Sequence, residues 1–450
     1  MTEYILKIEK MINEGYGLAR LENMPVFIND VCPNETVKVK IIRHNKNYLL
    51  GELIDVIVPS SSRVKPICPL HNACGSCNWQ HISYEEQLIQ KQNIVLETLK
   101  KIAGYNGKID KIIESPHTSE YRCKIQMPVS QTKVSKRILA GYYKKNSHEL
   151  INIKYCPMQP KIINVINEFV KEQAQILNIS AYDEKKHVGS LRHIIYRTNS
   201  QQSEILVNIV INGEVIDSNL KKLAEILFDN FKEIIGVCVN FNTKKTNVIL
   251  GNETKAIVGK SFYVENLSGI KYQISANSFF QVNPLCAEKI FNKVKELIST
   301  KTTNPTILDA YSGVSSFGIW LSDVASRVVS IEEVLSASND AKANIKLNNI
   351  KNLDVINGDA AIEFKKLIDS DMKFDVSITD PPRKGCTIES IENLVKLTNK
   401  YIVYVSCNVS TLARDMKLIN EKGFRTIYVQ PADLFPNTYH VETVCLLERK

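Results

Sequence analysis

The sequence predicts a multidomain protein with a small N-terminal β barrel, a mixed α/β middle domain and a C-terminal doubly wound α/β domain. The chain has 450 residues, which corresponds to about three ordinary domains. Short strand patterns separated by turn residues fill residues 1–58, whereas strands alternate with helices after residue 277. The composition, with 44% hydrophobic and 23% charged residues, is typical of folded proteins. We expect the domain limits at residues 1–58, 59–275 and 276–450.

The composition also narrows the class of protein. The first ten residues, MTEYILKIEK, alternate like a strand and lack the basic and apolar regions of an export signal. No stretch has the roughly 18 uninterrupted apolar residues of a membrane helix. We therefore expect a cytoplasmic protein without a membrane partner. The net charge of +9 is compatible with a polyanionic partner but does not require one.

Residues 1–58 have the spacing of a closed or half-closed barrel. Strand-forming runs at 37–42 and 49–58 follow turn signals at 15–17 and 33–34. Basic side chains gather on one predicted hairpin, where they suit either an RNA phosphate backbone or an edge strand protected by charge. These side chains are Lys38, Lys40, Arg43, His44 and Lys46.

A long amphipathic helix is predicted after the barrel. Ser83 and Glu86 form a capping box, and apolar residues then repeat at helical spacing up to about Ala103. The expected apolar face consists of Leu88, Val95, Leu96, Leu99 and Ile102.

The middle part of the chain, residues 109–274, returns to strand patterns with one clear helix near 162–174. It contains a run of aromatic and basic residues at 142–145, YYKK. Such a run is typical of proteins that bind single-stranded RNA, and also of exposed loops.

Polar residues end the predicted strands of the C-terminal domain. We expect these strands at 306–310, 327–331, 354–356, 374–379 and 401–406. Ligands of open α/β sheets bind beyond the carboxyl ends of the strands, so these end residues are candidate site residues. They are Asp309, Glu332, Asp359, Asp380 and Cys407.

The loop after the first of these strands favours a nucleoside cofactor without phosphates. Glu332 follows Gly313 by nineteen residues, a distance at which an acid can hold ribose hydroxyls. A pyrophosphate needs several glycines for close backbone approach, and this loop has one. S-adenosylmethionine meets these requirements.

Cys407, Asp380 and Glu442 supply a nucleophile and a candidate base. Carbon 5 of uracil is a poor nucleophile, but a thiolate that adds to carbon 6 makes it reactive toward a sulfonium methyl group. A base must then remove the proton from carbon 5 so that the cysteine can leave. Considered alone, Cys407 could also be an inert core residue and Glu442 a surface residue.

The sequence contains eleven cysteines, and four of them have the spacing of a metal site. Thiols stay reduced in the cytoplasm, so we interpret this spacing as metal binding rather than as disulfides. Cys68, Cys74 and Cys77 share one predicted loop, and Cys156 follows far along the chain. Four thiolates hold either zinc or a 4Fe-4S cluster, and three cysteines in one loop favour the cluster.

Together these motifs resemble, over nearly the whole chain, the bacterial 23S ribosomal RNA uracil-5-methyltransferases of the RumA type. The first domain resembles a TRAM RNA-binding barrel. Further matching motifs lie at residues 120–122, 191–193, 279–283, 406–408 and 435–442.

The resemblance implies a role for each candidate residue. Cys407 would be the nucleophile and Glu442 the base of a Rossmann-like methyltransferase domain, with which the helix from Ser83 would pack. The residues implied to bind S-adenosylmethionine are Gln281, Tyr311, Glu332 and Asp380, with Asp359 as a further candidate. The residues implied to bind a 4Fe-4S cluster are Cys68, Cys74, Cys77 and Cys156.

Two residues depart from the family pattern. Asn34 replaces a glycine of the barrel, and because asparagine tolerates positive φ we expect the turn to persist. Ser315 replaces the second glycine of the cofactor loop. Its side chain could crowd the methionine moiety of the cofactor or hydrogen-bond to it, so reduced cofactor affinity is a hypothesis.

The resemblance further implies an RNA partner, namely a loop of 23S rRNA that presents a flipped uridine to a monomeric enzyme, and no DNA partner. The cluster is expected to organise the middle domain without carrying electrons. Two alternatives remain open. One is a tRNA uracil-5-methyltransferase, which would ordinarily lack the barrel and the cluster, and the other is a noncatalytic iron-sulfur RNA-binding protein.

Overall fold

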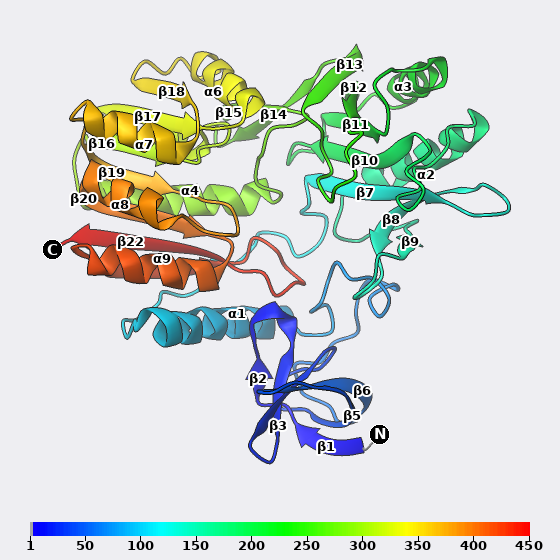
Figure 1. The fold of residues 1–450 in the computed structure, drawn as a ribbon, viewed down its shortest axis with the longest axis horizontal. Coiled ribbons are helices and arrows are strands. Elements are labelled where there is room, and N and C mark those ends of the chain that lie inside the picture. The colour runs from blue at the N-terminus through cyan, green and yellow to red at the C-terminus, as the bar shows by residue number, and fades with distance from the viewer. Residues whose placement is uncertain (1–2) are drawn as a thin grey trace.

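The computed structural model describes residues 3–450, whose strands form three large sheets and one hairpin. Figure 1 shows the barrel at the bottom, the middle domain on the right and the C-terminal domain on the left. Within these residues no helix combines the length and the apolar character that a membrane crossing requires.

The N-terminal barrel is a six-stranded sheet with strand order β1-β5-β6-β4-β3-β2. Val37, Val39 and Ile41 alternate into its core, as the strand pattern predicts. Asn34 has a φ of 69°, so the prediction that this turn persists is confirmed. The strands are β1 (Glu3–Lys7), β2 (Lys10–Met11), β3 (Gly17–Leu21), β4 (Met24–Ile28), β5 (Thr36–His44) and β6 (Leu49–Val58), and a short 3-10 turn, Asn13–Gly15, lies between β2 and β3.

Helix α1 (Tyr84–Thr98) follows the cysteine loop and continues as a π-helical turn, Leu99–Ala103. The Ser83 side chain accepts a hydrogen bond from Glu86 N, so the predicted N-cap is confirmed. The predicted apolar face is wrong at two positions, because Leu96 and Ile102 are each 37% exposed. The helix instead buries Gln87, Gln90 and Lys91 beside Leu88 and Val95, against the C-terminal domain.

The middle domain is a seven-stranded sheet with strand order β13-β12-β11-β10-β7-β8-β9. Its core joins α2 (Lys161–Ile176) and α3 (Ser218–Asn230) to one face of the sheet. The sequence pattern predicted α2 and missed α3, although Leu220, Leu223 and Leu227 repeat at helical spacing. The strands are β7 (Lys124–Gln131), β8 (Ile138–Tyr143), β9 (Leu150–Asn152), β10 (Leu191–Thr198), β11 (Ile205–Ile211), β12 (Ile234–Phe241) and β13 (Glu253–Gly259).

The C-terminal domain is a seven-stranded sheet with strand order β18-β17-β16-β19-β20-β22-β21. The neighbouring strands β18, β17, β16, β19 and β20 are parallel, as predicted. Strand β22 runs antiparallel to both of its neighbours, β20 and β21. The strands of this sheet are β16 (Thr306–Ala310), β17 (Arg327–Glu332), β18 (Leu353–Asn357), β19 (Phe374–Thr379), β20 (Thr398–Ser406), β21 (Phe424–Ala432) and β22 (Glu442–Arg449).

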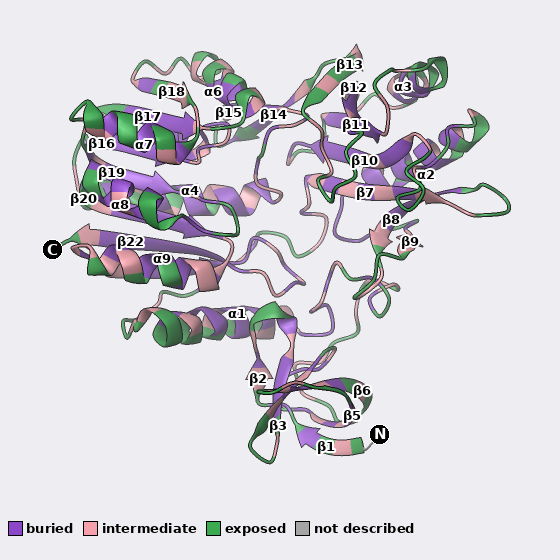
Figure 2. Cartoon of the chain, viewed as in Figure 1, coloured by how far each residue is buried: buried purple, intermediate pink, exposed green. Residues whose placement is uncertain are grey.

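Both faces of this sheet are covered, and its strands are mostly buried (Figure 2). One core contains α1 together with α7 (Ala360–Asp369), α8 (Ile388–Leu397) and α9 (Val409–Glu421). The other contains α4 (Pro284–Ser299), α5 (Ser316–Leu321) and the hairpin of β14 (Phe262–Leu267) and β15 (Ile270–Ser275). Helix α6 (Leu335–Leu347) binds this hairpin. The carboxyl ends of the parallel strands point toward the middle domain (Figure 1).

Candidate active site

The register of two neighbouring strands brings the predicted nucleophile and base together. Strand β20 ends at Ser406, which pairs with Thr443 of the antiparallel strand β22. Continuing this register by one residue places Cys407 opposite Glu442, the first residue of β22. The next residue after Cys407, Asn408, caps α9 through its side chain. The nucleophile therefore stands at a fixed junction between strand and helix.

Burial and mutual repulsion disfavour negative charge on the groups of this site. Glu442 is only 3% exposed, and burial followed by the neighbouring Asp380 raises its pKa well above the usual range. Burial raises the pKa of Asp380 to about 7. Burial, then Glu442 and Asp380, raise the pKa of the Cys407 thiol to about 11. Such shifts are typical of catalytic groups.

Arg383 is the positive charge that opposes these shifts. It lowers the pKa of both Cys407 and Glu442. Its backbone is fixed, because Arg383 O accepts a hydrogen bond from Asn408 Nδ2 at 3.1 Å. No sequence motif indicates a role for Arg383, although it directly follows Asp380, Pro381 and Pro382.

The predicted cofactor residues surround the ends of β16, β17 and β19. Gly313 N donates to Glu332 Oε2 at 2.8 Å, and Val334 N donates to Glu332 Oε1 at 2.7 Å, which fixes the carboxylate at the edge of the sheet. Gln281 Nε2 donates to Asp380 Oδ2 at 3.4 Å, so these two predicted residues are in contact. Tyr311, which lies with Gly313 in the loop after β16, has a φ of 59°.

Asp309 and Ser315 make buried hydrogen bonds at the base of the cofactor loop. Asp309 is buried and accepts a hydrogen bond from Gly318 N at 2.8 Å. The Ser315 hydroxyl is also buried and lies 2.7 Å from the hydroxyl of Ser330. The side chain of Ser315 therefore turns into the sheet, which argues against the expected crowding of a cofactor.

Asp359, the further cofactor candidate, caps a helix. Its Oδ1 atom accepts hydrogen bonds from Ala361 N at 2.9 Å and from Ile362 N at 3.2 Å, at the start of α7. This is the usual role of an N-cap aspartate.

The four predicted metal ligands line one small cavity. A zinc ion with bonds of about 2.3 Å would draw the sulfurs to within roughly 4 Å of one another. Within residues 3–450, only Asp30, His71 and His81 bring three potential ligand atoms within 4.8 Å, so no three of these sulfurs are that close. The cavity-lining cysteines are Cys68, Cys74, Cys77 and Cys156.

A second cluster, beside this cavity, joins the barrel to the cysteine loop. His81 Nε2 lies 3.0 Å from Val31 O of the barrel, and His81 Nδ1 lies 3.2 Å from His71 Nε2. Asp30 pairs with Lys145 at 2.6 Å. Burial lowers the pKa of His81 to about 4, so the imidazoles form a neutral hydrogen-bonded chain. Sequence reasoning missed it, although His71 lies within the cysteine run and His81 follows it.

Comparison with known proteins adds independent information. Residues 83–450 match the family described as tRNA (uracil-5-)-methyltransferase, and residues 2–54 match the TRAM domain. An uncharacterized RNA methyltransferase of Clostridium tetani is 36% identical over 446 residues, which cover 99% of this chain and 96% of that relative. Another, from Caldanaerobacter subterraneus, is 37% identical over 99% of this chain and 98% of the relative.

One solved structure is similar along the entire chain. It is the Pyrococcus abyssi tRNA (uracil-54, C5)-methyltransferase in complex with S-adenosyl-L-homocysteine. The TM-score is 0.78 and the sequence identity 26%, and the alignment covers 99% of this chain and 100% of that one.

Proposed function

Because this chain belongs to the tRNA (uracil-5-)-methyltransferase family and is an S-adenosylmethionine-dependent RNA methyltransferase, we propose that it methylates carbon 5 of a uridine in 23S rRNA. The transfer proceeds through a covalent bond between Cys407 and the base. The observation that carries the proposal is the register that sets Cys407 beside Glu442. Asp380 is close enough to raise the pKa of both groups. Family membership also removes the noncatalytic alternative.

Cys407 and Glu442 act in different steps of the proposed reaction. The Cys407 sulfur, as thiolate, adds to carbon 6 of uracil and makes carbon 5 nucleophilic. Bound S-adenosylmethionine would supply an electrophilic methyl group to carbon 5 and would leave as S-adenosylhomocysteine. Glu442 then takes the proton of carbon 5, the C5–C6 double bond re-forms, and the Cys407 sulfur leaves with its electron pair. Arg383 stabilises the thiolate before addition.

The ends of the strands fit the cofactor. Glu332 holds a fixed carboxylate at the ribose position, and Gln281 with Asp380 forms a polar pair between that position and Cys407. Tyr311 directly follows β16, the strand between β17 and β19. Gln281, Tyr311, Glu332 and Asp380 would therefore hold S-adenosylmethionine with its methyl group toward the nucleophile.

The four-cysteine cavity supports a 4Fe-4S cluster as a structural group. No three of the sulfurs lie within 4.8 Å of one another, which favours a group larger than one ion, and the cavity lies where the cysteine loop meets the middle domain. Cys68, Cys74, Cys77 and Cys156 would hold the cluster and join these two parts. The proposed chemistry contains no redox step, so the cluster organises the structure.

The choice between rRNA and tRNA needs an experiment. The expectation that a barrel distinguishes the rRNA enzymes is wrong, because a tRNA (uracil-54, C5)-methyltransferase covers 99% of this chain, barrel included. That similarity favours tRNA as a second candidate. The resemblance of the motifs to the 23S rRNA enzymes favours rRNA.

Mapping of 5-methyluridine tests the proposed target. In cells that lack the protein, we expect one or more 5-methyluridines of 23S rRNA to disappear and to return with the wild-type gene but not with Cys407→Ala. Loss of 5-methyluridine from tRNA alone would establish the second candidate, and unchanged rRNA and tRNA would contradict both.

A further inference from the structure

The segment of residues 433–440 leads into the strand that begins with Glu442. Other parts of the chain hold this segment; for example, the Tyr121 hydroxyl donates to Pro436 O at 3.0 Å. The backbone of Glu442 pairs with Ala432, the last residue of β21, which directly precedes Asp433. The Oε1 atom of Glu442 has no hydrogen-bond partner among the described residues. The position of this carboxylate therefore depends on the backbone of Ala432 and of the segment that joins it to Glu442.

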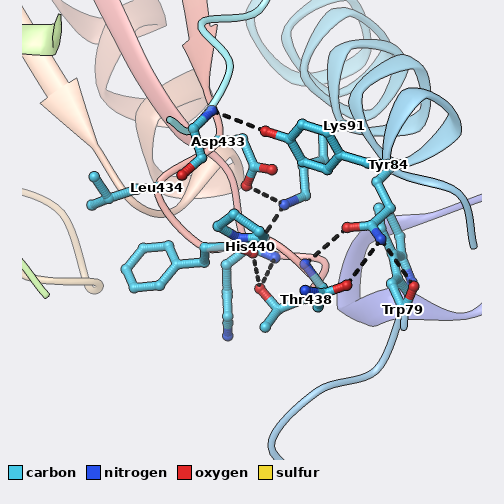
Figure 3. Close-up of polar contacts among 12 residues, drawn as sticks. Trp79, Tyr84, Lys91, Asp433, Leu434, Thr438 and His440 are labelled. Carbon is cyan, nitrogen blue, oxygen red and sulfur yellow. Dashed lines mark hydrogen bonds and ion pairs between the residues drawn. The ribbon is translucent and has the colours of Figure 1, made fainter. Parts of the chain in front are cut away.

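A buried ion pair joins this segment to α1 (Figure 3). Lys91 Nζ lies 2.5 Å from Asp433 Oδ1 and donates to Phe435 O at 3.1 Å. Both charged side chains are 0% exposed. Burying two charges costs desolvation energy that their attraction only partly offsets, so such a pair is weak evidence for added stability. It does fix one arrangement of α1 against residues 433–435.

Gln87, one turn earlier on α1, holds the next part of the segment. Asn437 N donates to Gln87 Oε1 at 2.8 Å, and Gln87 Nε2 donates to Asn437 Oδ1 at 3.3 Å. Trp79 N donates to Asn437 O at 3.0 Å. Gln87 and Lys91 thus occupy the buried face of α1, where helix packing alone would favour apolar residues.

We propose that Lys91 is a positioning residue for Glu442, and that α1 sets this carboxylate against the proton of carbon 5. The proposal rests on the proposed function. Proton abstraction needs the base within about 3.2 Å of its target, and a shift of about 1 Å can cost about 100-fold in rate. Cys407 directly follows β20, outside this segment, and among the described residues no hydrogen bond joins it to residues 433–437. Loss of Lys91 should therefore slow proton removal and spare the addition of the thiolate.

The two steps can be measured separately with two RNAs. In RNA that contains 5-fluorouridine, carbon 5 carries no proton, so the covalent adduct forms without the base and stays. We expect Lys91→Met to form this adduct within about twofold of the wild-type rate. On uridine RNA its turnover should fall by about 10- to 100-fold, and methylated enzyme–RNA adduct should accumulate, as with Glu442→Gln.

Lys171 of α2 offers a matched control. It is also a buried lysine, 5% exposed, that pairs with Glu168 at 2.5 Å and donates to Ile153 O at 3.2 Å. It lies in the middle domain, away from residues 433–440. Lys171→Met should therefore lower stability without accumulation of adduct on uridine RNA. If Lys91→Met fails to fold, Gln87→Leu makes the same test, because it removes both hydrogen bonds to Asn437.

Each outcome has one meaning. Accumulation of methylated adduct in Lys91→Met or Gln87→Leu, but not in Lys171→Met, supports the positioning role. Equal slowing of adduct formation and turnover, or the same behaviour in Lys171→Met, overturns it. If wild-type protein forms no adduct with 5-fluorouridine 23S rRNA or tRNA, the proposed function itself fails.

Discussion

Cys407 and the four cysteines of the cavity are all partly or wholly buried thiols, yet their surroundings differ. Cys407 ends a strand of a parallel sheet beside Asp380 and Glu442, with Arg383 as the opposing charge. The cavity is built from loops, and no carboxylate is among its described lining residues. Burial raises the pKa of Cys407 and of Cys156 to about 11. Each site therefore needs a different source of stabilisation for its thiolate.

This contrast shows that the role of a buried cysteine depends on the group that stabilises its thiolate. At the edge of the sheet, Arg383 and addition to the substrate provide that compensation. In the cavity, metal coordination would provide it, because bound metal deprotonates a thiol outright. The following predictions test the contrast.

The largest effect is expected from Cys407→Ala. The variant should lose methyl transfer by about 10⁴-fold or more, because no other group can form the bond to carbon 6. Its thermal midpoint should stay within about 2 °C of wild type, since Cys407 is only partly buried and lies at the end of its strand. Transfer of labelled methyl groups to RNA measures the loss. Activity close to wild type would refute the nucleophile.

Cys77→Ala should instead affect metal content and stability. Removing one of four thiolates would weaken the proposed site, and a bound metal would contribute to folding, so we expect a loss of about 3 kcal/mol or more of unfolding free energy. Iron analysis of anaerobically purified protein and thermal unfolding measure both effects. Full iron content with an unchanged thermal midpoint would show that Cys77 is not a ligand.

The pH dependence of adduct formation tests how the Cys407 thiolate arises. Because the pKa of this thiol is raised to about 11, the thiolate fraction grows as pH rises toward that value. The rate with 5-fluorouridine RNA should increase about tenfold per pH unit between about pH 6.5 and 8.5. Arg383→Met should lower the rate by about threefold or more at each pH, through a further rise of the pKa. A flat profile would mean that the thiolate is already formed.

A glycine of the barrel tests the contact between the barrel and the segment of residues 433–440. Gly15 has a φ of 88°, and a Cβ there would lie 2.9 Å from Tyr439, next to His440. Gly269 has nearly the same φ, 90°, but no atom within 4 Å of its Cβ position. Gly15→Ala should cost about 1 kcal/mol more unfolding free energy than Gly269→Ala. Equal costs in denaturant unfolding would contradict this contact.

The smallest effect is expected from Ser315→Gly. The Ser315 hydroxyl contacts Ser330, and the residue has a φ of 61°, which glycine adopts without strain. The relief of strain and the loss of this hydrogen bond should nearly cancel, and the dissociation constant for S-adenosylmethionine should change by less than about threefold. Titration calorimetry measures it. A large gain in affinity would restore the crowding hypothesis.

Much of the fold follows from local sequence patterns. Strands β16 and β19 begin and end where the sequence predicts, because buried parallel strands are continuous apolar runs. The end residues of such strands also locate the site, since the carboxyl ends meet at one edge of the sheet. The resemblance, rather than any spacing, supplied Gln281.

The rest depends on contacts between distant residues. Lys91 and Gln87 look like the solvent-facing side of a helix, and only their contacts with residues 433–437, about 340 positions away, explain their burial. The direction of the Ser315 side chain depends on Ser330 of a different strand. No local pattern contains this information.

The most direct test of the account is to find the atom that bonds to RNA. The protein, S-adenosylmethionine and 5-fluorouridine-containing 23S rRNA or tRNA are incubated, and the digested complex is mapped by mass spectrometry. We predict a stable adduct on the peptide that contains Cys407, with a mass that includes one added methyl group. An adduct on another residue, or none with either RNA, would contradict the covalent mechanism.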